Sequence, residues 1–119
     1  MTGPQQVDLF FSYRVTEGKE ALFEQYLAKV LPVTEQEEPY VLEYHLFRNA
    51  DGTVFQHERY ADEAAIRDHL RVTADGQADW AAATELLEIR MVGPLSQAFL
   101  DEFSVPASAQ FRRFREVAR

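Results

Sequence analysis

Three histidines, at positions 45, 57 and 69, are the side chains of this sequence best suited to move a proton near neutral pH. His69 follows Ala65 and precedes Leu70 at the spacing of one helical face, so we expect its imidazole to point toward the core. There it is either a base or hydrogen-bond donor for a bound ligand, or a packing residue held by a backbone carbonyl. The sequence leaves both interpretations open.

Two more ionisable residues come just before this helix, in a pattern typical of a strand. Glu58 and Tyr60 are two residues apart, and alternate residues of a strand share one face. A buried Glu58 needs a partner, because an unpaired charge is costly to bury, and we expect Arg90 to supply it. Glu58 is then either half of a structural ion pair or a carboxylate that meets the substrate. Tyr60 either donates a hydrogen bond to an oxyanion or anchors the start of the helix.

The other two histidines follow from strand parity. His57 shares a face with Phe55, which predicts a position in a pocket or in a dimer interface, and His57 is the second candidate for a catalytic base. His45 has the parity of Glu43, which favours an interfacial or solvent-facing position.

Flat aromatic side chains are suited to holding an aromatic ligand, although single aromatic residues are also common in cores. The candidates for this substrate-binding role are Trp80, Phe11, Tyr13 and Tyr44. The histidines lack the spacing of a metal site, and the sequence has no glycine-rich phosphate loop and no nucleophile elbow. The absence of cysteine excludes disulfides, thiolate metal sites and thiol nucleophiles.

Composition limits the class of protein. The 119 residues predict a single domain over residues 1–119. The formal net charge of −8 argues against binding to nucleic acid or to an anionic membrane. No signal peptide and no apolar run of membrane-spanning length appears, so we expect a soluble, cytoplasmic protein. The basic C-terminal tail either pairs with the acidic body of a subunit or is simply solvated.

Hydrophobic periodicity and turn signals predict the elements that position these side chains. The expected strands are Val7–Val15, Tyr40–Arg48, Thr53–Tyr60, Leu86–Val92 and a candidate terminal strand over Ala109–Phe114. The expected helices are one from Thr16 that ends at Pro32, one after the N-cap Asp62, a stretch holding Trp80 after a break at Asp75-Gly76, and a short one over Leu95–Phe103. An acidic loop, Glu35–Glu38, is expected after the first helix.

The predicted order of elements is strand, helix, strand, strand, helix, strand, followed by a C-terminal extension over residues 93–119. This is the split βαβ arrangement of a ferredoxin-like α+β domain, with helices on one face of an antiparallel sheet and a core over residues 7–92. The second strand carries apolar residues on both faces: Leu42, Tyr44 and Leu46 on one, and Val41 and Phe47 on the other. A large open apolar face is unusual on a monomer, so we expect a homodimer in which two sheets pack face to face.

Several short motifs, taken in order, resemble the antibiotic biosynthesis monooxygenase domain family. They are Glu17-Gly18-Lys19 with Phe23, Glu38-Pro39 with Glu43-Tyr44 and Phe47-Arg48, and Glu58-Arg59-Tyr60 with Asp62-Glu63-Ala64-Ala65 and His69. The resemblance covers residues 7–92 and continues loosely into Gly93-Pro94-Leu95. It implies the dimeric α+β barrel fold.

The family includes cofactor-free monooxygenases that oxidise phenols and quinols with dioxygen, haem-degrading enzymes, and proteins without a demonstrated reaction. The haem-degrading branch uses an Asn, a Trp and a His, of which this sequence matches only His69, with Tyr60 in the Trp position. The resemblance therefore implies a monooxygenase that needs no cofactor and acts on a small phenolic or quinol-type aromatic. The alternatives are a non-catalytic barrel that binds a small hydrophobic metabolite, and an isomerase or decarboxylase of the same fold.

Overall fold

The computed structural model describes residues 5–119 as one mixed sheet with helices packed against it. In chain order the elements are β1 (Val7–Val15), α1 (Glu20–Glu37), β2 (Val41–Arg48), β3 (Val54–Tyr60), α2 (Glu63–Val72), α3 (Ala74–Ala83), β4 (Thr84–Val92), α4 (Gln97–Glu102), the 3-10 turn η1 (Ala107–Ala109) and β5 (Gln110–Phe111). The strand order is β2-β3-β1-β4-β5. The first four strands pair antiparallel, which confirms the ferredoxin-like α+β prediction, but β5 adds to β4 in parallel.

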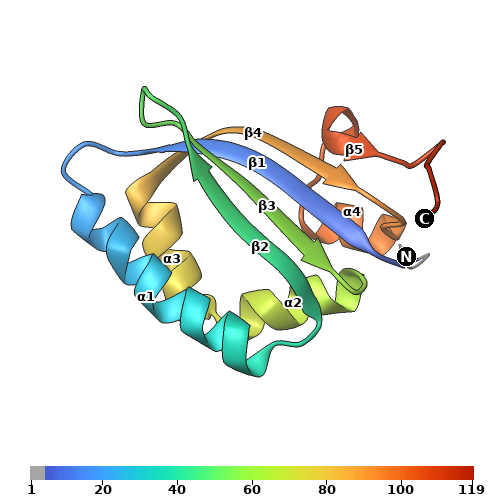
Figure 1. Ribbon diagram of the computed structural model, residues 1–119, viewed down its shortest axis with the longest axis horizontal. Coiled ribbons are helices and arrows are strands. Elements are labelled where there is room, and N and C mark those ends of the chain that lie inside the picture. Colours follow the sequence, from blue (N-terminus) through green and yellow to red (C-terminus); the bar gives the residue numbers. More distant parts are fainter. Residues whose placement is uncertain (1–4) are drawn as a thin grey trace.

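The domain has two layers (Figure 1). Helices α1, α2 and α3 lie against one face of the sheet, and α4 lies at its β4 side. The opposite face of the sheet is left without a covering helix in the part of the chain that the structure describes. Within residues 5–119 no helix has the length and apolar character needed to cross a membrane. The core therefore forms between the sheet and these helices.

Helix α1 continues past Pro32 to Glu37, so the predicted end at Pro32 and the predicted acidic loop are wrong. Pro32 cannot donate a backbone hydrogen bond to the carbonyl group one turn earlier, which weakens a helix at this point. Packing outweighs this loss, because Val30 and Thr34 on either side of Pro32 are buried. The longer helix carries Glu38, the residue that follows it, into the protein interior.

The predicted break between α2 and α3 exists but lies at Thr73, before the predicted Asp75-Gly76, and α3 includes Gly76. A Cβ atom at position 76 would overlap the Cγ2 methyl group of Val30 on α1. The glycine therefore allows two helices to approach each other closely and does not end one of them. The predicted helical stretch around Trp80 is confirmed.

Strand β2 contains a shift in register that changes which side chains face the core. Val41 pairs with Tyr60 and Tyr44 pairs with Glu58, so the shift lies between Val41 and Glu43. A bulge of this kind breaks the simple alternation of faces. Val41 therefore packs against the core with Tyr44, and the prediction that it shares the other face with Phe47 is wrong.

The boundaries of the C-terminal elements differ from the predicted ones. Strand β4 begins at Thr84, two residues earlier than predicted, α4 is limited to Gln97–Glu102, and β5 has only two residues. Ser96 ends the loop before α4 because its hydroxyl group accepts a hydrogen bond from the Phe99 backbone at 3.1 Å. The predicted N-cap Asp62 is confirmed, since it accepts a hydrogen bond from the Ala65 backbone at 2.9 Å.

Candidate active site

A cavity of about 190 Å³ lies between the sheet and the helices. Its lining comes from β1, β3 and β4 and from all four α-helices or the residue that follows them: Leu9, Phe11, Tyr26, Glu58, Tyr60, Ile66, Leu70, Gln77, Trp80, Leu86, Ile89, Met91, Phe99 and Phe103. Most of these side chains are apolar, and the polar groups are Glu58 and Tyr60 on β3, Tyr26 on α1 and Gln77 on α3. A largely apolar cavity with a few polar groups is the usual form of a small-molecule site.

Glu58 and Tyr60 are the ionisable groups of the cavity wall on β3, which confirms that they share a face. The Tyr60 hydroxyl donates a hydrogen bond to Glu58 Oε1, and Gln56 Nε2 donates one to Glu58 Oε2 at 2.6 Å. Burial raises the pKa of the Glu58 carboxyl group above its ordinary range, although these hydrogen bonds oppose the shift. Glu58 is thus a buried carboxyl group held by neutral donors, which is a suitable arrangement for accepting a proton.

A chain of hydrogen bonds connects Glu58 to the tyrosines behind it. Tyr13 donates to Gln56 Oε1 at 2.7 Å, and Gln56 Nε2 lies 3.1 Å from the Tyr26 hydroxyl, which is itself hydrogen-bonded to the Tyr44 hydroxyl. Burial raises the pKa of each of these three tyrosines above its ordinary value. They therefore stay protonated at neutral pH and form a fixed polar support for Glu58.

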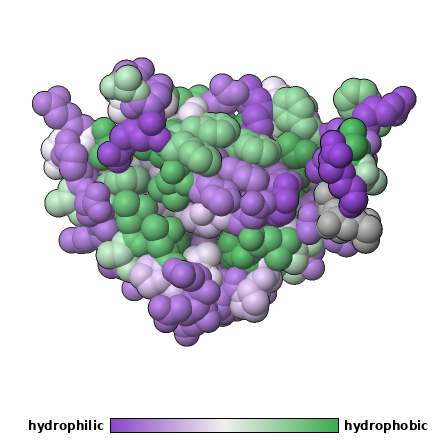
Figure 2. Space-filling model, viewed as in Figure 1, coloured by the Kyte–Doolittle hydropathy of each residue, from purple (hydrophilic) through white to green (hydrophobic). Residues whose placement is uncertain are grey.

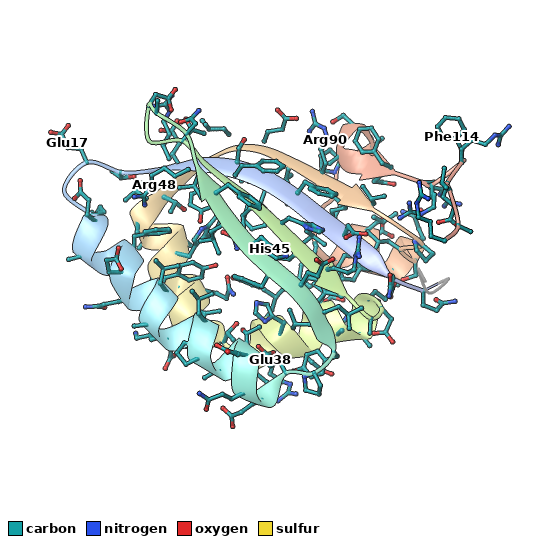
Figure 3. The ribbon with its side chains drawn as sticks, in the orientation of Figure 1. Glu17, Glu38, His45, Arg48, Arg90 and Phe114 are labelled. Atoms are coloured by element: carbon teal, nitrogen blue, oxygen red, sulfur yellow. The ribbon has the colours of Figure 1, made fainter. Side chains whose placement is uncertain are left out.

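His69 is buried, as predicted, but its partner is a carboxyl group and not a backbone carbonyl. Its Nδ1 atom lies 3.0 Å from Glu38 Oε1. Glu38 also accepts hydrogen bonds from Thr34 Oγ1 at 2.8 Å and from the Tyr40 hydroxyl at 2.9 Å. Figure 3 shows Glu38 where the end of α1 approaches α2. Such a pair fixes the orientation and tautomer of the imidazole, as in other carboxylate–histidine pairs.

Gln77 lies between His69 and the cavity. Its Nε2 atom is 3.4 Å from His69 Nε2 and 3.1 Å from Thr73 Oγ1, and its side chain lines the cavity, whereas His69 does not. The ring of His69 also packs against the ring of Tyr60, with centroids 5.6 Å apart. The imidazole is therefore next to the cavity, behind Gln77 and Tyr60, and not part of its wall.

The aromatic candidates separate into two groups. Trp80 and Phe11 line the cavity and meet edge to face, with ring centroids 5.8 Å apart. Tyr13 and Tyr44 lie outside the lining, in the hydrogen-bonded network behind Glu58. Of the four predicted aromatic residues, only the first two are in place to touch a ligand directly.

His57 and His45 lie on the open face of the sheet, away from the cavity. His57 stacks on Phe10, with centroids 4.5 Å apart, and its Nε2 atom lies 2.7 Å from Asp8 Oδ1. His45 is 3.2 Å from Glu43, as its parity predicts. His57 is therefore separated from Glu58 and Tyr60 by the thickness of the sheet.

The expected pairing of Glu58 with Arg90 is wrong. Arg90 pairs across β1 with Phe10, whereas Glu58 pairs with Leu9, so the two side chains are on opposite faces of the sheet. Arg90 instead makes a 2.8 Å ion pair with Glu88. Figure 3 shows Arg90 on the side of the sheet away from α1, α2 and α3. Neutral hydrogen-bond donors take the place of the expected positive charge beside Glu58.

The polar site residues that were not among the sequence-based candidates are Tyr26, Glu38, Gln56 and Gln77. The parity of β3 places Gln56 on the face of Glu58, so that signal was available. Gln77 and His69 meet through the packing of α2 and α3, for which the sequence gives no spacing rule. Among residues 5–119, no group of three histidine, aspartate or glutamate side chains is arranged to hold a metal ion.

A family model described as "Antibiotic biosynthesis monooxygenase" matches residues 9–83. No curated protein sequence matches the chain. The fold resembles that of MupZ from Pseudomonas fluorescens, at 19% identity and a TM-score of 0.73, over 97% of this chain and 95% of MupZ.

Two further solved structures resemble the chain over a smaller part of its length. SnoaB from Streptomyces nogalater, described as a cofactor-independent oxygenase, is 16% identical with a TM-score of 0.61 over 78% of this chain and 96% of SnoaB. Rv0793 from Mycobacterium tuberculosis is 19% identical with a TM-score of 0.61 over 79% of this chain and 99% of Rv0793. At these identities the likeness concerns the fold alone.

Proposed function

Since the chain belongs to the antibiotic biosynthesis monooxygenase family, we propose that it is a monooxygenase that oxidises a phenolic or quinol-type aromatic with dioxygen and needs no cofactor. The observation that carries the proposal is the cavity itself, which combines apolar and aromatic walls with a buried carboxyl group, Glu58, and the adjacent hydroxyl group of Tyr60. The fold shared with SnoaB, described as a cofactor-independent oxygenase, supports it.

The chemistry requires the substrate to supply the electrons. A phenol with a pKa near 10 must first lose its proton, which costs on the order of 4 kcal/mol at neutral pH. The phenolate then gives one electron to dioxygen, and the two radicals combine to a peroxide. Loss of water from this peroxide leaves a quinone, so that one oxygen atom enters the product and the other leaves as water. A site for this reaction needs a base, a donor for the phenolate and a dry cavity.

Glu58 is the proposed base and Tyr60 the proposed donor. The raised pKa of Glu58 makes its carboxylate a stronger base than an exposed glutamate, and brings its pKa closer to that of a phenol. The pKa of Tyr60 is raised by burial and by the neighbouring Glu58, so its hydroxyl group remains a donor. Both groups reach the cavity from the same strand, which allows them to meet one substrate oxygen together.

We propose that His69 is a positioning residue for Tyr60 and Gln77. It packs against the Tyr60 ring and contacts Gln77, and Glu38 holds its orientation. If the Gln77 side chain moved aside, the Nε2 atom of His69 would be exposed to the cavity. His69 would then serve as a second base. His57 has no proposed part in this chemistry, because it lies on the other face of the sheet.

A second candidate function rests on the same pair of groups. Glu58 and Tyr60 could move a proton between two positions of a substrate without oxygen, as an isomerase or a decarboxylase does. The close contact between a carboxyl group that accepts and a hydroxyl group that donates favours this alternative over a purely structural barrel. The two enzymatic proposals differ in whether dioxygen is consumed.

Oxygen consumption therefore tests the proposal. The purified protein is mixed with a panel of naphthols and anthrones in the presence of a chelator, without flavin or haem, and an oxygen electrode records the rate. We expect the protein to consume oxygen faster than buffer does and to form the quinone. The Glu58→Gln variant should lose this oxygen consumption. A rate equal to that of buffer for every compound contradicts the monooxygenase, and product formation without oxygen uptake favours the second function.

The proposal includes a second copy of the chain on the open face of the sheet. Phe47 and Phe55 are 54% and 46% exposed there and stack on each other, and Phe55 also stacks on Phe10. Figure 2 shows hydrophobic patches and a hydrophilic cluster side by side on the surface of the molecule. Exposed aromatic side chains that gather on one face are typical of a protein–protein interface. We propose that this face forms a homodimer.

A further inference from the structure

The cavity has two ends: a polar end formed by Glu58 and Tyr60 on β3, and an aromatic end formed by Phe99 and Phe103 beyond β4. Glu58 and Tyr60 are on β3, Leu9 and Phe11 are on β1, and Ile89 and Met91 are on β4, so the lining crosses three neighbouring strands. Beyond β4, the C-terminal helix α4 and the residue after it add Phe99 and Phe103. A ligand whose hydroxyl group meets Glu58 therefore extends toward α4.

Helix α4 is held in place by polar contacts with α2. The Glu63 carboxylate accepts hydrogen bonds from the Ser96 backbone at 2.7 Å and from its hydroxyl group at 2.8 Å. Arg67 makes a 3.1 Å ion pair with Glu102 and lies over the ring of Phe99. These contacts fix the aromatic end of the cavity, whose residues Phe99 and Phe103 lie outside the residues 9–83 that match the family model.

The volume limits what fits between these two ends. At about 190 Å³ the cavity is little larger than the roughly 150 Å³ engineered cavity that holds one benzene molecule, and smaller than the 300 Å³ or more typical of sites for drug-sized ligands. Phe99 is fully buried, so the aromatic end does not yield without repacking. Phe103, at 36% exposure, lies at the rim.

We propose that α4 and Phe103 restrict the cavity to compact aromatic ligands of one or two rings with a hydroxyl group directed at Glu58. Phe103 is thus a specificity-determining residue. The choice of a hydroxyl-bearing ligand rests on the proposed function, whereas the size limit rests on the cavity. A larger, three-ring ligand has to displace Phe103 and the ion pair between Arg67 and Glu102.

Anaerobic equilibrium dialysis tests this limit, because binding is then measured without oxidation. The probes are 2-naphthol and 2-hydroxyanthracene, and the proteins are the wild type, Phe103→Ala, Glu102→Gln and the control Phe114→Ala. Phe114 is 82% exposed on the C-terminal tail and does not line the cavity. Circular dichroism confirms that each variant is folded before it is compared.

We expect the wild type and Phe114→Ala to bind 2-naphthol about tenfold more tightly than 2-hydroxyanthracene, the scale on which a pocket rejects an oversized group. Phe103→Ala should bring the ratio close to one, and Glu102→Gln should narrow it, since it loosens α4. The inference is overturned if the wild type binds the three-ring probe as tightly as the two-ring probe, if it binds neither, or if both variants keep the wild-type ratio. Selective binding without oxygen consumption supports the size limit and contradicts only the monooxygenase.

Discussion

Glu58 is the residue on which the proposed chemistry depends most. It is buried, it accepts hydrogen bonds from Tyr60 and Gln56, and it makes no ion pair with the described residues, although a charge on nearby His69 would favour its ionised form. A carboxylate in this position is costly, because its charge is removed from water without a directly paired cation. A structural role alone would be served as well by glutamine, which makes Glu58→Gln an informative substitution.

The first prediction concerns activity. Glu58→Gln should lower kcat/KM for the oxidised phenol by about 10² to 10⁴-fold, the usual contribution of a positioned general base. In the wild type, kcat/KM should rise with pH through the pKa of Glu58, which lies above that of an exposed glutamate because the group is buried. Initial rates at a series of pH values measure both effects. Unchanged rates in Glu58→Gln would remove Glu58 from the mechanism.

The second prediction concerns stability and follows from the same pKa. The folded protein binds the Glu58 proton more tightly than the unfolded chain does, because burial raises the pKa in the folded state only. Between the ordinary pKa of glutamate and the raised one, the folded state holds more protons, and its stability falls as the pH rises. Glu58→Gln lacks this contribution. Urea unfolding at several pH values should therefore show that the variant gains stability relative to the wild type as the pH rises through that range.

The third prediction concerns the pair of His69 and Glu38. Both side chains are buried, so removing one leaves the other without its partner. His69→Ala and Glu38→Ala should each lower the free energy of unfolding by about 3–5 kcal/mol, and the double variant should lose much less than the sum. A double-mutant cycle by urea unfolding measures this coupling. Additive losses would show that the two side chains act independently.

At the scale of elements, the packing of α1 against α3 positions the site. Gly76 on α3 meets Val30 on α1, and the next turn of α3 presents Gln77 and Trp80 to the cavity. A shift of α3 away from α1 would therefore move two residues of the cavity wall. The contact at Gly76 is small, but it sets the distance between two elements of the site.

The fourth prediction tests this contact. Gly76→Ala should lower the free energy of unfolding by about 1–3 kcal/mol, because the added methyl group overlaps Val30 and forces the helices apart. Val30→Ala removes the overlap at the cost of a cavity, so the double variant should be less unstable than the two single losses together. Urea unfolding of all three variants measures the difference. A stabilising Gly76→Ala, as helix propensity alone predicts, would contradict the close approach.

The sequence predicts the strands and their order better than it predicts the limits of the helices. Strand parity correctly places Glu58 with Tyr60, because the two-residue period is fixed by local geometry. Local rules fail at Pro32 and at Gly76, where tertiary packing outweighs the tendency to end a helix. The same error hides Glu38, since a residue assigned to an acidic loop gives no reason to expect a buried partner of His69.

At the scale of the whole molecule, the two faces of the sheet have different chemistry. The helix-covered face holds the cavity with Glu58 and Tyr60. The open face holds stacked aromatic rings beside Asp8. Asp8 accepts hydrogen bonds from His57 at 2.7 Å and from Arg59 at 2.8 Å. Asp8 is only 3% exposed although no helix covers it. Asp8, His57 and Arg59 are thus already paired within the chain, which leaves the exposed aromatic rings for a partner.

The fifth prediction concerns this partner. Phe55→Lys places a charge among the exposed rings of the open face, and it should convert a dimer into a monomer, since burying an unpaired charge in an interface is strongly unfavourable. Phe114→Lys, on the tail, should leave the dimer intact. Sedimentation velocity measures the mass of each protein, and circular dichroism confirms the fold.

Because the cavity is formed within one chain, the monomeric Phe55→Lys should still bind 2-naphthol. A wild type that sediments as a monomer at micromolar concentration would instead mean that the open face is not a homodimer interface.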